Sequence, residues 1–580
     1  MDNEVRGHTS NRPWQEWWDV SMREFRTGWL KRMVVGLAAC CALLLAAPCP
    51  GAAYQHARSR VSYHEYSEEA FRLAERTGRP IFIVLAAKWC YWCRAYERET
   101  LEREEVATFL NRNFINVFVD LDERQDLQHR YVQRGIPTSV ILRPDGRQYL
   151  TFSGILPPAD FLAGMHEVLK GLAQPAAKHR SGARYSVRDV RPLLEPGGAP
   201  AITAARAERL AAEFRELALA NYDAAFAGFG TEQKYPQGAL LTELLLATPE
   251  EPSALRPAVL STLDRIRAHL LDRVEGGFHR YAERRDWSSV RYEKMLVPNV
   301  ALVRAFQAAG SAGPGREDAA RRAEHAAVAR DALRFVLAVY YQPARGGFSG
   351  SVEGTSQRYF RSDRAQRARM QAPAVDATIY TAWNAEAVAV LADVQRAQPE
   401  PALQAALART LALLDEKLST PRQGVHGRLD PATGTVRGLG QLGDNAWAAL
   451  AFAIGHEGSG EARYRAAMER TLDYALRELW LAEVHAFRAW SIPAGSDVRP
   501  SERVSDAVPL RENAVMGLAL VQAHRLTGNP RYRSAAQELL AALAVLEPDQ
   551  FDDNPGDGGK RYLEAFAIYH KALRALTQFN

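Results

Sequence analysis

The spacing of apolar and polar residues divides the chain into three unlike stretches. A short apolar run follows basic residues near the N-terminus. From about residue 60 to residue 172, short runs rich in β-branched and aromatic residues alternate with helical patterns. Beyond about residue 204, Ala, Leu, Arg and Glu recur with helical periodicity, and strand-like runs are few. The pattern predicts a multidomain protein in which an α/β domain precedes an all-α domain.

The N-terminal stretch has the order of a secretory signal, which is a basic region, a short apolar region and then small residues. The apolar run Met33 to Ala47 has 15 residues, fewer than the roughly 20 that span a bilayer as a helix. We therefore expect residues 1–53 to be an N-terminal extension and signal peptide that is cleaved near Ala53, with Met22 as an alternative start. Export to the periplasm follows, with membrane contact only through this segment. The alternative is a chain tethered to the membrane by an uncleaved segment.

The second stretch, residues 54–172, alternates helices and strands around a pair of cysteines. The expected elements are a helix at 67–77, a strand at 80–86, a helix after 93, a strand at 114–121, a helix from about 126, strands at 139–142 and up to 152, and a helix at 158–172. Cys90 and Cys93 stand between the first strand and the following helix. A cysteine at such a helix N-terminus is favoured as a thiolate, because free N–H groups and the helix dipole stabilise negative charge.

Three interpretations of this C-x-x-C pair are open: a redox-active pair, an inert structural disulfide, and half of a zinc site. The other three of the five cysteines, Cys40, Cys41 and Cys49, fall within the predicted signal segment. An exported chain would keep one pair, in a compartment where thiols oxidise. Zinc normally takes four ligands, and no second C-x-x-C or suitable His pair accompanies this one. We favour the redox interpretation and expect no metal ion.

Trp89-Cys90-Tyr91-Trp92-Cys93, together with the later Ile136-Pro137-Thr138, resembles the thioredoxin family over this whole stretch. The resemblance implies that Pro137 is cis and sits against the cysteine pair. It also implies that Cys90 is the attacking thiol and Cys93 the resolving thiol. Lys88 would add positive potential that favours the Cys90 thiolate. The chain departs from many thioredoxins at Val84, where they carry a buried acid, and this departure leaves the direction of the redox reaction open.

A linker rich in Ala, Pro and Gly at 173–203 precedes the helical domain, residues 204–580. Twelve candidate helices make six hairpins; they begin near Ala204, Gly238, Ser253, Glu293, Asp318, Ala377, Glu400, Asp444, Glu461, Arg511, Arg531 and Arg561. Gly-rich connections with an aromatic residue or a His recur every 50 to 80 residues or so. This organisation resembles the (α/α)6 toroid of six-hairpin glycosidases and N-acylglucosamine 2-epimerases. A helical-repeat solenoid is the alternative.

One block of residues makes this resemblance more specific. It consists of Gly276-Gly277-Phe278-His279-Arg280-Tyr281, then Trp287, then Arg291-Tyr292-Glu293-Lys294-Met295-Leu296. It is similar to a block of a poorly characterised family that joins a thioredoxin-like domain to such a toroid, the spermatogenesis-associated thioredoxin-like proteins. That family usually has His and Phe at the positions of Arg291 and Tyr292. The resemblance covers both domains.

A sugar site needs aromatic planes and polar side chains that bind hydroxyl groups. The candidates for this site are His279, Arg280, Tyr281, Trp287, Arg291, Tyr292, Glu293, Trp383, Asn384, Asp444, Trp447 and Asn513. Glycoside hydrolysis would need two carboxylates, for example Glu293 with Asp376, Asp444 or Asp506. Epimerisation would need a His, for which His279 and His426 are candidates. The plainer interpretations are Trp residues that pack in the core and a Glu293-Lys294 pair that caps a helix with surface charges.

Composition excludes some classes of function. The 73 basic and 68 acidic residues give a net charge of +5, and no dense basic block follows the N-terminal region, so no nucleic-acid partner is expected. No phosphate-binding or dinucleotide-binding spacing occurs in a convincing strand-to-helix context, so no cofactor is expected.

The leading hypothesis is an exported thiol–disulfide oxidoreductase that acts on protein clients. It depends on an electron-transfer partner that this chain does not encode, and its toroid binds a carbohydrate-like ligand or a client. The alternatives are a sugar epimerase, isomerase or glycoside hydrolase with an accessory thioredoxin-like domain, and a binding scaffold without turnover.

Overall fold

The computed structural model describes residues 59–132, 135–173, 191, 194, 199–247, 254–311, 319–494, 504, 505, 507–545 and 560–578. The predicted signal segment, its cleavage site, most of the expected linker and Asp506 lie outside these residues. Tyr54–Asn580 form one compact unit that contains both the α/β domain and the helical domain. In the described part of the chain, no helix is both long and apolar enough to cross a membrane.

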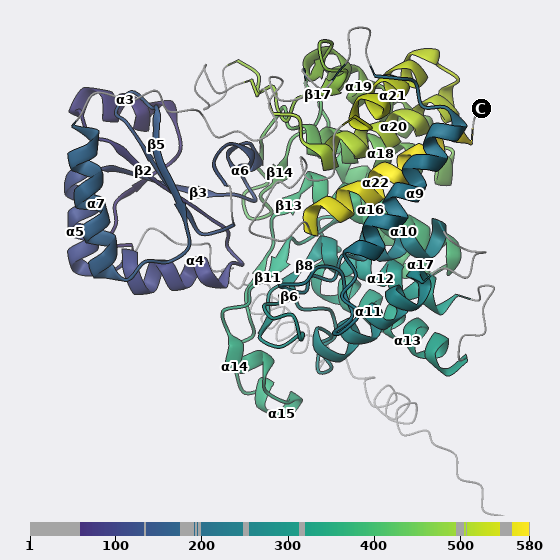
Figure 1. The fold of residues 1–580 in the computed structure, drawn as a ribbon, viewed down its shortest axis with the longest axis horizontal. Coiled ribbons are helices and arrows are strands. Elements are labelled where there is room, and N and C mark those ends of the chain that lie inside the picture. Colours follow the sequence, from purple (N-terminus) through teal and green to yellow (C-terminus); the bar gives the residue numbers. More distant parts are fainter. Residues whose placement is uncertain are drawn as a thin grey trace, which may run out of the picture. The chain divides into compact units, whose positions relative to one another are not determined.

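The α/β domain is built on a mixed sheet of five strands (Figure 1). The strand order is β1 (Tyr63–His64), β3 (Ile115–Asp120), β2 (Ile81–Ala86), β4 (Thr138–Leu142) and β5 (Gln148–Ser153). β1, β3 and β2 are parallel, whereas β4 and β5 run antiparallel to their neighbours. The helices are α3 (Glu68–Thr77), α4 (Tyr91–Tyr96), α5 (Glu104–Asn113), α6 (Gln125–Tyr131) and α7 (Pro158–Leu172), with a π-helical turn, η2, at Glu97–Leu101. The sequence pattern did not predict β1, α5 or η2.

The central strand β2 is buried along its whole length because both faces of the sheet are covered. Phe82, Val84 and Ala86 pack in the same cluster as the two cysteines. Their neighbours Ile81, Ile83 and Leu85 pack in a second cluster on the other face. Successive side chains of a strand point to opposite faces, so a strand covered on both sides is a continuous apolar run.

The helical domain contains all twelve predicted helices, each starting within about one turn of its expected position. They are α9 (Ala204–Ala220), α10 (Gly238–Ala247), α11 (Leu255–His269), α12 (Leu296–Gly310), α13 (Ala319–Phe335), α16 (Thr381–Ala397), α17 (Pro401–Leu413), α18 (Leu442–Ser459), α19 (Ala462–Glu478), α20 (Leu510–Thr527), α21 (Pro530–Leu543) and α22 (Lys560–Thr577). Two short helices, α14 (Gln357–Phe360) and α15 (Arg364–Arg367), lie in the connection before α16 and were not predicted.

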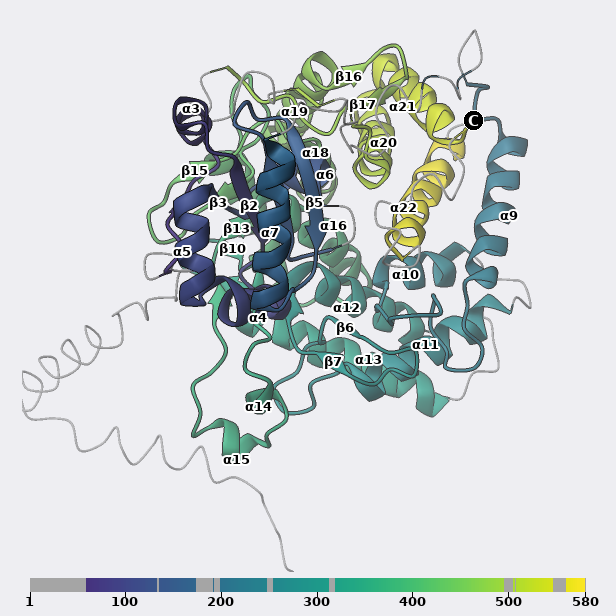
Figure 2. The ribbon, with the colours of Figure 1, turned by 60° about the vertical axis from the view of Figure 1, so that its left-hand side comes forward.

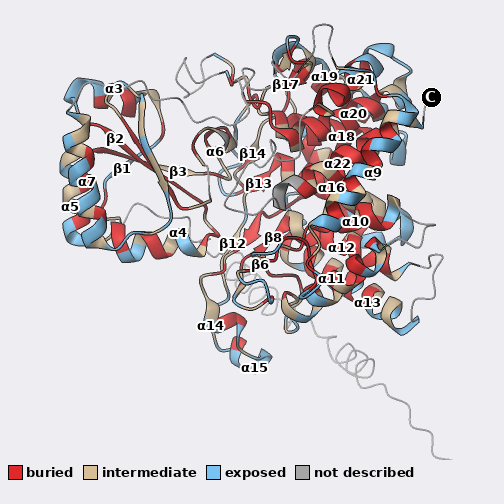
Figure 3. Cartoon of the chain, in the orientation of Figure 1, coloured by how far each residue is buried: buried red, intermediate tan, exposed pale blue. Residues whose placement is uncertain are grey.

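Six of these helices form a closed inner ring. Each of α10, α12, α16, α18, α20 and α22 packs against the next, and α22 packs back against α10. The alternating helices α9, α11, α13, α17, α19 and α21 form the outer layer (Figure 2). Residues of α18 and α20 are buried along most of their lengths, as Figure 3 shows in red. Because the last inner helix meets the first, the predicted (α/α)6 toroid is confirmed and an open solenoid is wrong.

An asparagine at the fourth residue of four inner helices anchors the connection before each helix. These residues are Asn299, Asn384, Asn445 and Asn513. Asn384 Oδ1 accepts the Phe348 N–H at 2.7 Å, and its Nδ2 donates to the Phe348 carbonyl at 3.0 Å. Asn513 makes the same pair of bonds to Phe487. These amides satisfy buried backbone groups that would otherwise have no partner. Asn384 and Asn513 therefore have a structural role, and their contact with a ligand stays a prediction.

Candidate functional site

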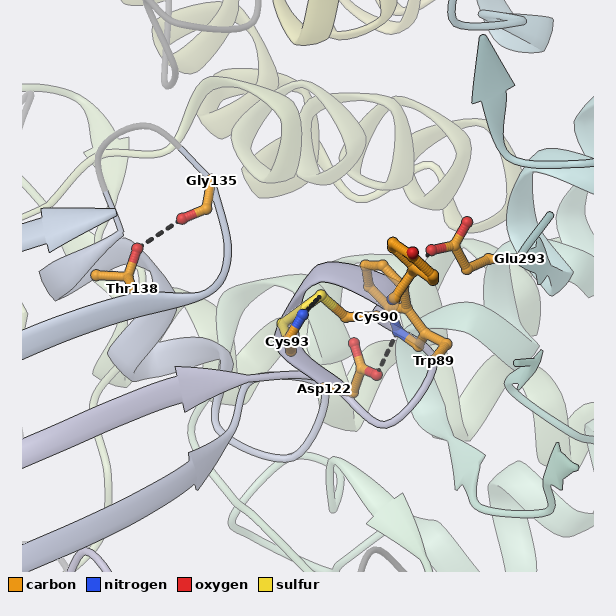
Figure 4. Close-up of a disulfide and its surroundings, with 8 residues drawn as sticks. Trp89, Cys90, Cys93, Asp122, Gly135, Thr138 and Glu293 are labelled. Carbon is orange, nitrogen blue, oxygen red and sulfur yellow. Dashed lines mark hydrogen bonds between the residues drawn. A yellow bond between two sulfur atoms is a disulfide. The ribbon is translucent and has the colours of Figure 1, made fainter. Parts of the chain in front are cut away.

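Cys90 and Cys93 form a disulfide between the end of β2 and the start of α4 (Figure 4). Cys90 is the N-cap of α4, and its Sγ accepts the Cys93 N–H at 3.1 Å. Both cysteines are about 3% exposed. The predicted setting of strand, C-x-x-C and helix is therefore present, with the pair oxidised and covered.

The loop before β4 carries the proline that the resemblance singled out. The Ile136–Pro137 peptide bond is cis, and Ile136 packs against the cluster that contains both cysteines. Thr138 Oγ1 donates to the Gly135 carbonyl at 2.5 Å across this loop. The contact of Pro137 with a substrate stays a prediction.

Lys88 does not present a free positive charge to Cys90. Its Nζ lies 2.9 Å from Glu123, 3.5 Å from Asp120 and 3.9 Å from Asp376. Burial opposes the charge on Lys88, but these carboxylates raise its pKa above the ordinary value. Burial raises the pKa of Asp120 to about 7, with Lys88 acting in the opposite direction. The carboxylates offset the lysine charge, and the effect of Lys88 on a Cys90 thiolate stays a prediction.

Trp89, the residue before Cys90, is held from both sides. Its Nε1 donates to Asp122 Oδ2 at 2.7 Å, and the guanidinium of Arg280 lies 4.3 Å from the centre of its ring. Burial raises the pKa of the Asp122 carboxyl. At the position of the missing thioredoxin acid, Val84 is packed among apolar side chains. Within the α/β domain, the acids near Lys88 and Trp89 therefore come from the end of β3 and the residues that follow it.

Residues 280–295 of the helical domain cover the C-x-x-C loop. Glu293 Oε1 accepts the Tyr91 N–H at 3.2 Å, and Trp92 Nε1 donates to Glu283 Oε1 at 3.3 Å. The Arg291 guanidinium lies 4.8 Å from the centre of the Tyr91 ring and 4.4 Å from that of Trp92. Figure 4 shows Glu293 facing this loop. Part of the block that was expected to line a ligand cavity thus packs on the redox loop.

Other members of the same block are buried in the toroid. His279 Nδ1 lies 3.1 Å from the Tyr292 carbonyl oxygen, and burial lowers the pKa of His279 to about 3. Tyr292 stacks on Phe360 at 5.5 Å between ring centres. Because His279 stays neutral over the physiological range, this structure does not support it as an acid catalyst near neutral pH.

Trp287 and Lys294 also have structural partners. Trp287 is 1% exposed, and its Nε1 donates to the Phe226 carbonyl at 3.0 Å. Lys294 is 1% exposed and forms an ion pair with Asp272 at 2.8 Å, so the interpretation of Glu293-Lys294 as a surface charge pair is wrong. Tyr281 is buried and stacks on Tyr235 at 4.4 Å between ring centres.

A cavity of about 320 Å³ opens beside Trp89, at the N-terminal ends of the inner helices. We call it the mouth cavity. Three tryptophans and five charged residues are among those that line it: Trp89, Trp383, Trp447, Arg280, Glu386, Arg511, Glu512 and Glu564. Arg511 Nη2 donates to both oxygens of Glu386, at 2.7 and 2.8 Å. Burial raises the pKa of Glu386, and Arg511 opposes this. A cavity of about 460 Å³ inside the ring shares Glu386 and Trp447 with the mouth cavity.

The sequence analysis named Arg280, Trp383 and Trp447 as candidates but missed Glu386 and Arg511. Glu386 is the only charged residue among the otherwise apolar residues 385–391, a run that a packed helix would bury. A buried acid is rare without a partner, so this residue could have been identified as a site candidate from the sequence. Arg511 begins a helix, where a charged residue is ordinary, and carried no such signal.

The proposed carboxylates lie at different places. Glu293 contacts the cysteine loop, Asp376 lies near Lys88, and Asp506 is outside the described residues. Asp444 lines another cavity, of about 310 Å³, together with His426. Its Oδ1 accepts the Ala382 N–H at 3.1 Å, and burial raises the pKa of Asp444 to about 7, whereas burial lowers that of His426. Within the described part of the chain, no group of three acidic, His or Cys side chains is placed to hold a metal ion.

Residues 51–193 match the family Thioredox_DsbH, described as a protein of unknown function, DUF255. Spermatogenesis-associated protein 20 of Mus musculus is 30% identical over 281 residues, which cover 44% of this chain and 35% of the mouse protein. The predicted family resemblance is confirmed. The Homo sapiens protein of the same name is 26% identical over 376 residues, 60% of this chain and 44% of the human protein. The chain thus spans less than half the length of these relatives.

Among solved structures, a D-mannose isomerase matches the toroid with a TM-score of 0.50 and 11% identity. The match covers 64% of this chain and 98% of the isomerase. Identity at this level shows the fold alone. The α/β thioredoxin-like domain followed by an (α/α)6 toroid is therefore the architecture that the sequence predicted.

Proposed function

We propose that the protein is an exported thiol–disulfide oxidoreductase in which Cys90 attacks and Cys93 resolves the mixed disulfide. The observation that carries the proposal is the Cys90–Cys93 disulfide at the junction of β2 and α4, with the cis Ile136–Pro137 bond in the loop before β4. The thioredoxin-like family match over residues 51–193 supports it. Export is inferred from the order of basic, apolar and small residues at the N-terminus.

Toroid residues pack over the cysteine pair and restrict how a client reaches it. Both sulfurs belong to buried residues, and Glu283, Arg291 and Glu293 contact the two residues between them. A protein thiol or disulfide would therefore react after these contacts open. Repeated turnover also needs an electron-transfer partner, because each client reaction leaves the pair in the opposite redox state.

The test is trapping of the mixed disulfide. With Cys93→Ala, Cys90 should hold a client or a model disulfide as a stable adduct, because no resolving thiol is present. The matched variant Cys90→Ala should hold none and should also lose insulin-disulfide reduction. Equal trapping by both variants, or full activity in Cys90→Ala, would show that the roles are assigned wrongly.

A second candidate function rests on the mouth cavity. Trp383 and Trp447 offer flat apolar faces, and the Glu386–Arg511 pair offers a carboxylate and a guanidinium side by side, a combination that suits a sugar ring and its hydroxyl groups. We propose that the toroid binds a carbohydrate-like ligand here. If the ligand is turned over, the chain is a sugar epimerase, isomerase or glycoside hydrolase.

This candidate is tested by titrating mannose and cellobiose while following tryptophan fluorescence. Trp383→Phe should weaken binding at least tenfold, whereas Trp480→Phe, on a strand away from the cavity-lining residues, should leave it unchanged. Absence of a saturable signal with the unmodified protein would refute the sugar proposal and leave the redox proposal untouched.

A further inference from the structure

Glu293 is a carboxylate of the toroid that binds the backbone of the C-x-x-C loop. Its Oε1 accepts the N–H of Tyr91, the residue directly after Cys90, at 3.2 Å. The side chain is buried, and Oε2 accepts no hydrogen bond from any described residue. Figure 4 shows this carboxylate beside the loop that carries Cys90. A buried carboxyl group of the toroid thus contacts the residue directly after the cysteine that would become a thiolate.

The cations around the pair are matched by other carboxylates. Lys88 lies near Asp120, Glu123 and Asp376. Arg291 pairs with Glu283, and Arg94 lies 3.8 Å from Glu353. Arg280 stacks on Trp89. In contrast, Glu293 has no ion-pair partner among the described residues. Of the two toroid carboxylates that contact the C-x-x-C loop, Glu283 and Glu293, only Glu283 is paired with a cation among the described residues, and Glu293 binds the N–H of the residue directly after Cys90.

We propose that Glu293 is a positioning residue that disfavours the Cys90 thiolate and so holds the pair at a low reduction potential. This inference rests on the proposed redox function. The disulfide is neutral, so a neighbouring carboxylate affects mainly the reduced state, in which Cys90 can carry charge. Destabilising the reduced state makes the pair a better reductant, the converse of a strong oxidant whose reduced form is stabilised. The toroid would then determine whether the pair acts as a reductant or as an oxidant, which the absence of a buried acid at Val84 left open.

The reaction that reports this effect is exchange with glutathione. Two glutathione thiols pass two electrons to the pair, the Cys90–Cys93 bond breaks, and glutathione disulfide forms. The protons of the two glutathione thiols go to the protein sulfurs, or to solvent where Cys90 stays ionised. The equilibrium constant of this exchange measures how much the reduced protein is stabilised.

The test is Glu293→Gln in the mature chain, because the amide keeps an oxygen for the Tyr91 N–H and loses the charge. At pH 8 the equilibrium constant for reduction should rise about tenfold, equivalent to about 30 mV. At pH 5 the difference should be smaller, because protonation of Cys90 removes the charge that the Glu293 carboxylate disfavours. Glu293→Asp, which keeps the charge, should stay nearer the unmodified protein than Glu293→Gln.

A second readout guards against a purely structural effect. In a Cys93→Ser background, the pH at which alkylation of Cys90 reaches half its maximal rate should be lower with Gln at position 293. An unchanged equilibrium constant, or a change that is the same at pH 5 and pH 8, overturns the inference while the redox function stands. A pair that never equilibrates with glutathione overturns the proposed function, and the inference with it.

Discussion

The guanidinium of Arg291 lies 4.4 Å from the centre of the Trp92 ring, so a toroid residue packs on the residue between the two cysteines. Arg291 also contacts Tyr91, and its Nε donates to Glu283, which in turn accepts from Trp92 Nε1. Through these contacts the toroid packs on both residues between the two cysteines. The helical domain therefore belongs to the redox site as well as to its own cavities.

Arg291→Ala should open this cover. Two cation–π contacts at a partly exposed site are worth about 1 kcal/mol in sum or somewhat more, so the rate of reduction of the disulfide by dithiothreitol should rise about tenfold. The rate is followed by alkylation of the released thiols. Arg285→Ala, which removes an arginine bound to Asp223 in the toroid, is the matched control and should react at the unmodified rate. Equal rates in all three proteins would contradict the idea of a cover.

Asn384→Ala should destabilise the toroid without changing the reactivity of the redox pair. The change leaves the buried N–H and carbonyl of Phe348 without their partner, at a cost of about 2–4 kcal/mol. Urea unfolding measures the loss. Gln398→Ala, at the exposed end of the same helix, should change the free energy of unfolding by less than about 0.5 kcal/mol. A stable Asn384→Ala protein that fails to bind sugars would instead favour a ligand role.

Asp444 should make stability fall as the pH rises. Burial raises its pKa to about 7 in the folded chain, from 3.8 ordinarily. The folded state thus binds the Asp444 proton more tightly than the unfolded state does. The stability that protonated Asp444 contributes at low pH is lost between about pH 4 and pH 7. Asp444→Asn keeps an oxygen for the Ala382 N–H and carries no charge. It should nearly match the unmodified protein at pH 4 and exceed it by about 4 kcal/mol at pH 8 in urea unfolding. An equal difference at both pH values would refute this cause.

Local patterns in the sequence were enough to predict most of the long elements of both domains, although α5 was missed. The continuous apolar run of β2, the tight C-x-x-C and the Gly-rich connections each have a local physical cause, because they depend on burial of a strand or on backbone turns. The toroid ring was predicted from helices that recur with glycine-marked turns, and all of them are present. The short strand β1 was missed, since two residues are too few to show a period.

The partners of the site could not be predicted, because they depend on surfaces that meet across long separations in sequence. Glu293 and Tyr91 are 202 residues apart, and nothing local to either shows that they are hydrogen-bonded. The positive charge of Lys88 is evident from the sequence. Its three carboxylate neighbours are not, because they come together only when β3, the residues after it and the connection before α16 have folded. From the sequence, Asn384 and Asn513 are plausible ligand contacts; only the structure shows that their amides are hydrogen-bonded to the backbone.

The most direct test of the redox proposal is the reduction potential of the Cys90–Cys93 pair in the purified mature protein, by equilibration with glutathione and alkylation. Because the Glu293 carboxyl group contacts the residue after Cys90 and has no ion-pair partner among the described residues, we expect reversible reduction at a potential nearer to the roughly −270 mV of thioredoxin than to the roughly −120 mV of a strong oxidant. A value near the oxidant end would contradict the electrostatic account. A pair that stays oxidised at every glutathione ratio, or that never forms a disulfide, would contradict the redox function itself.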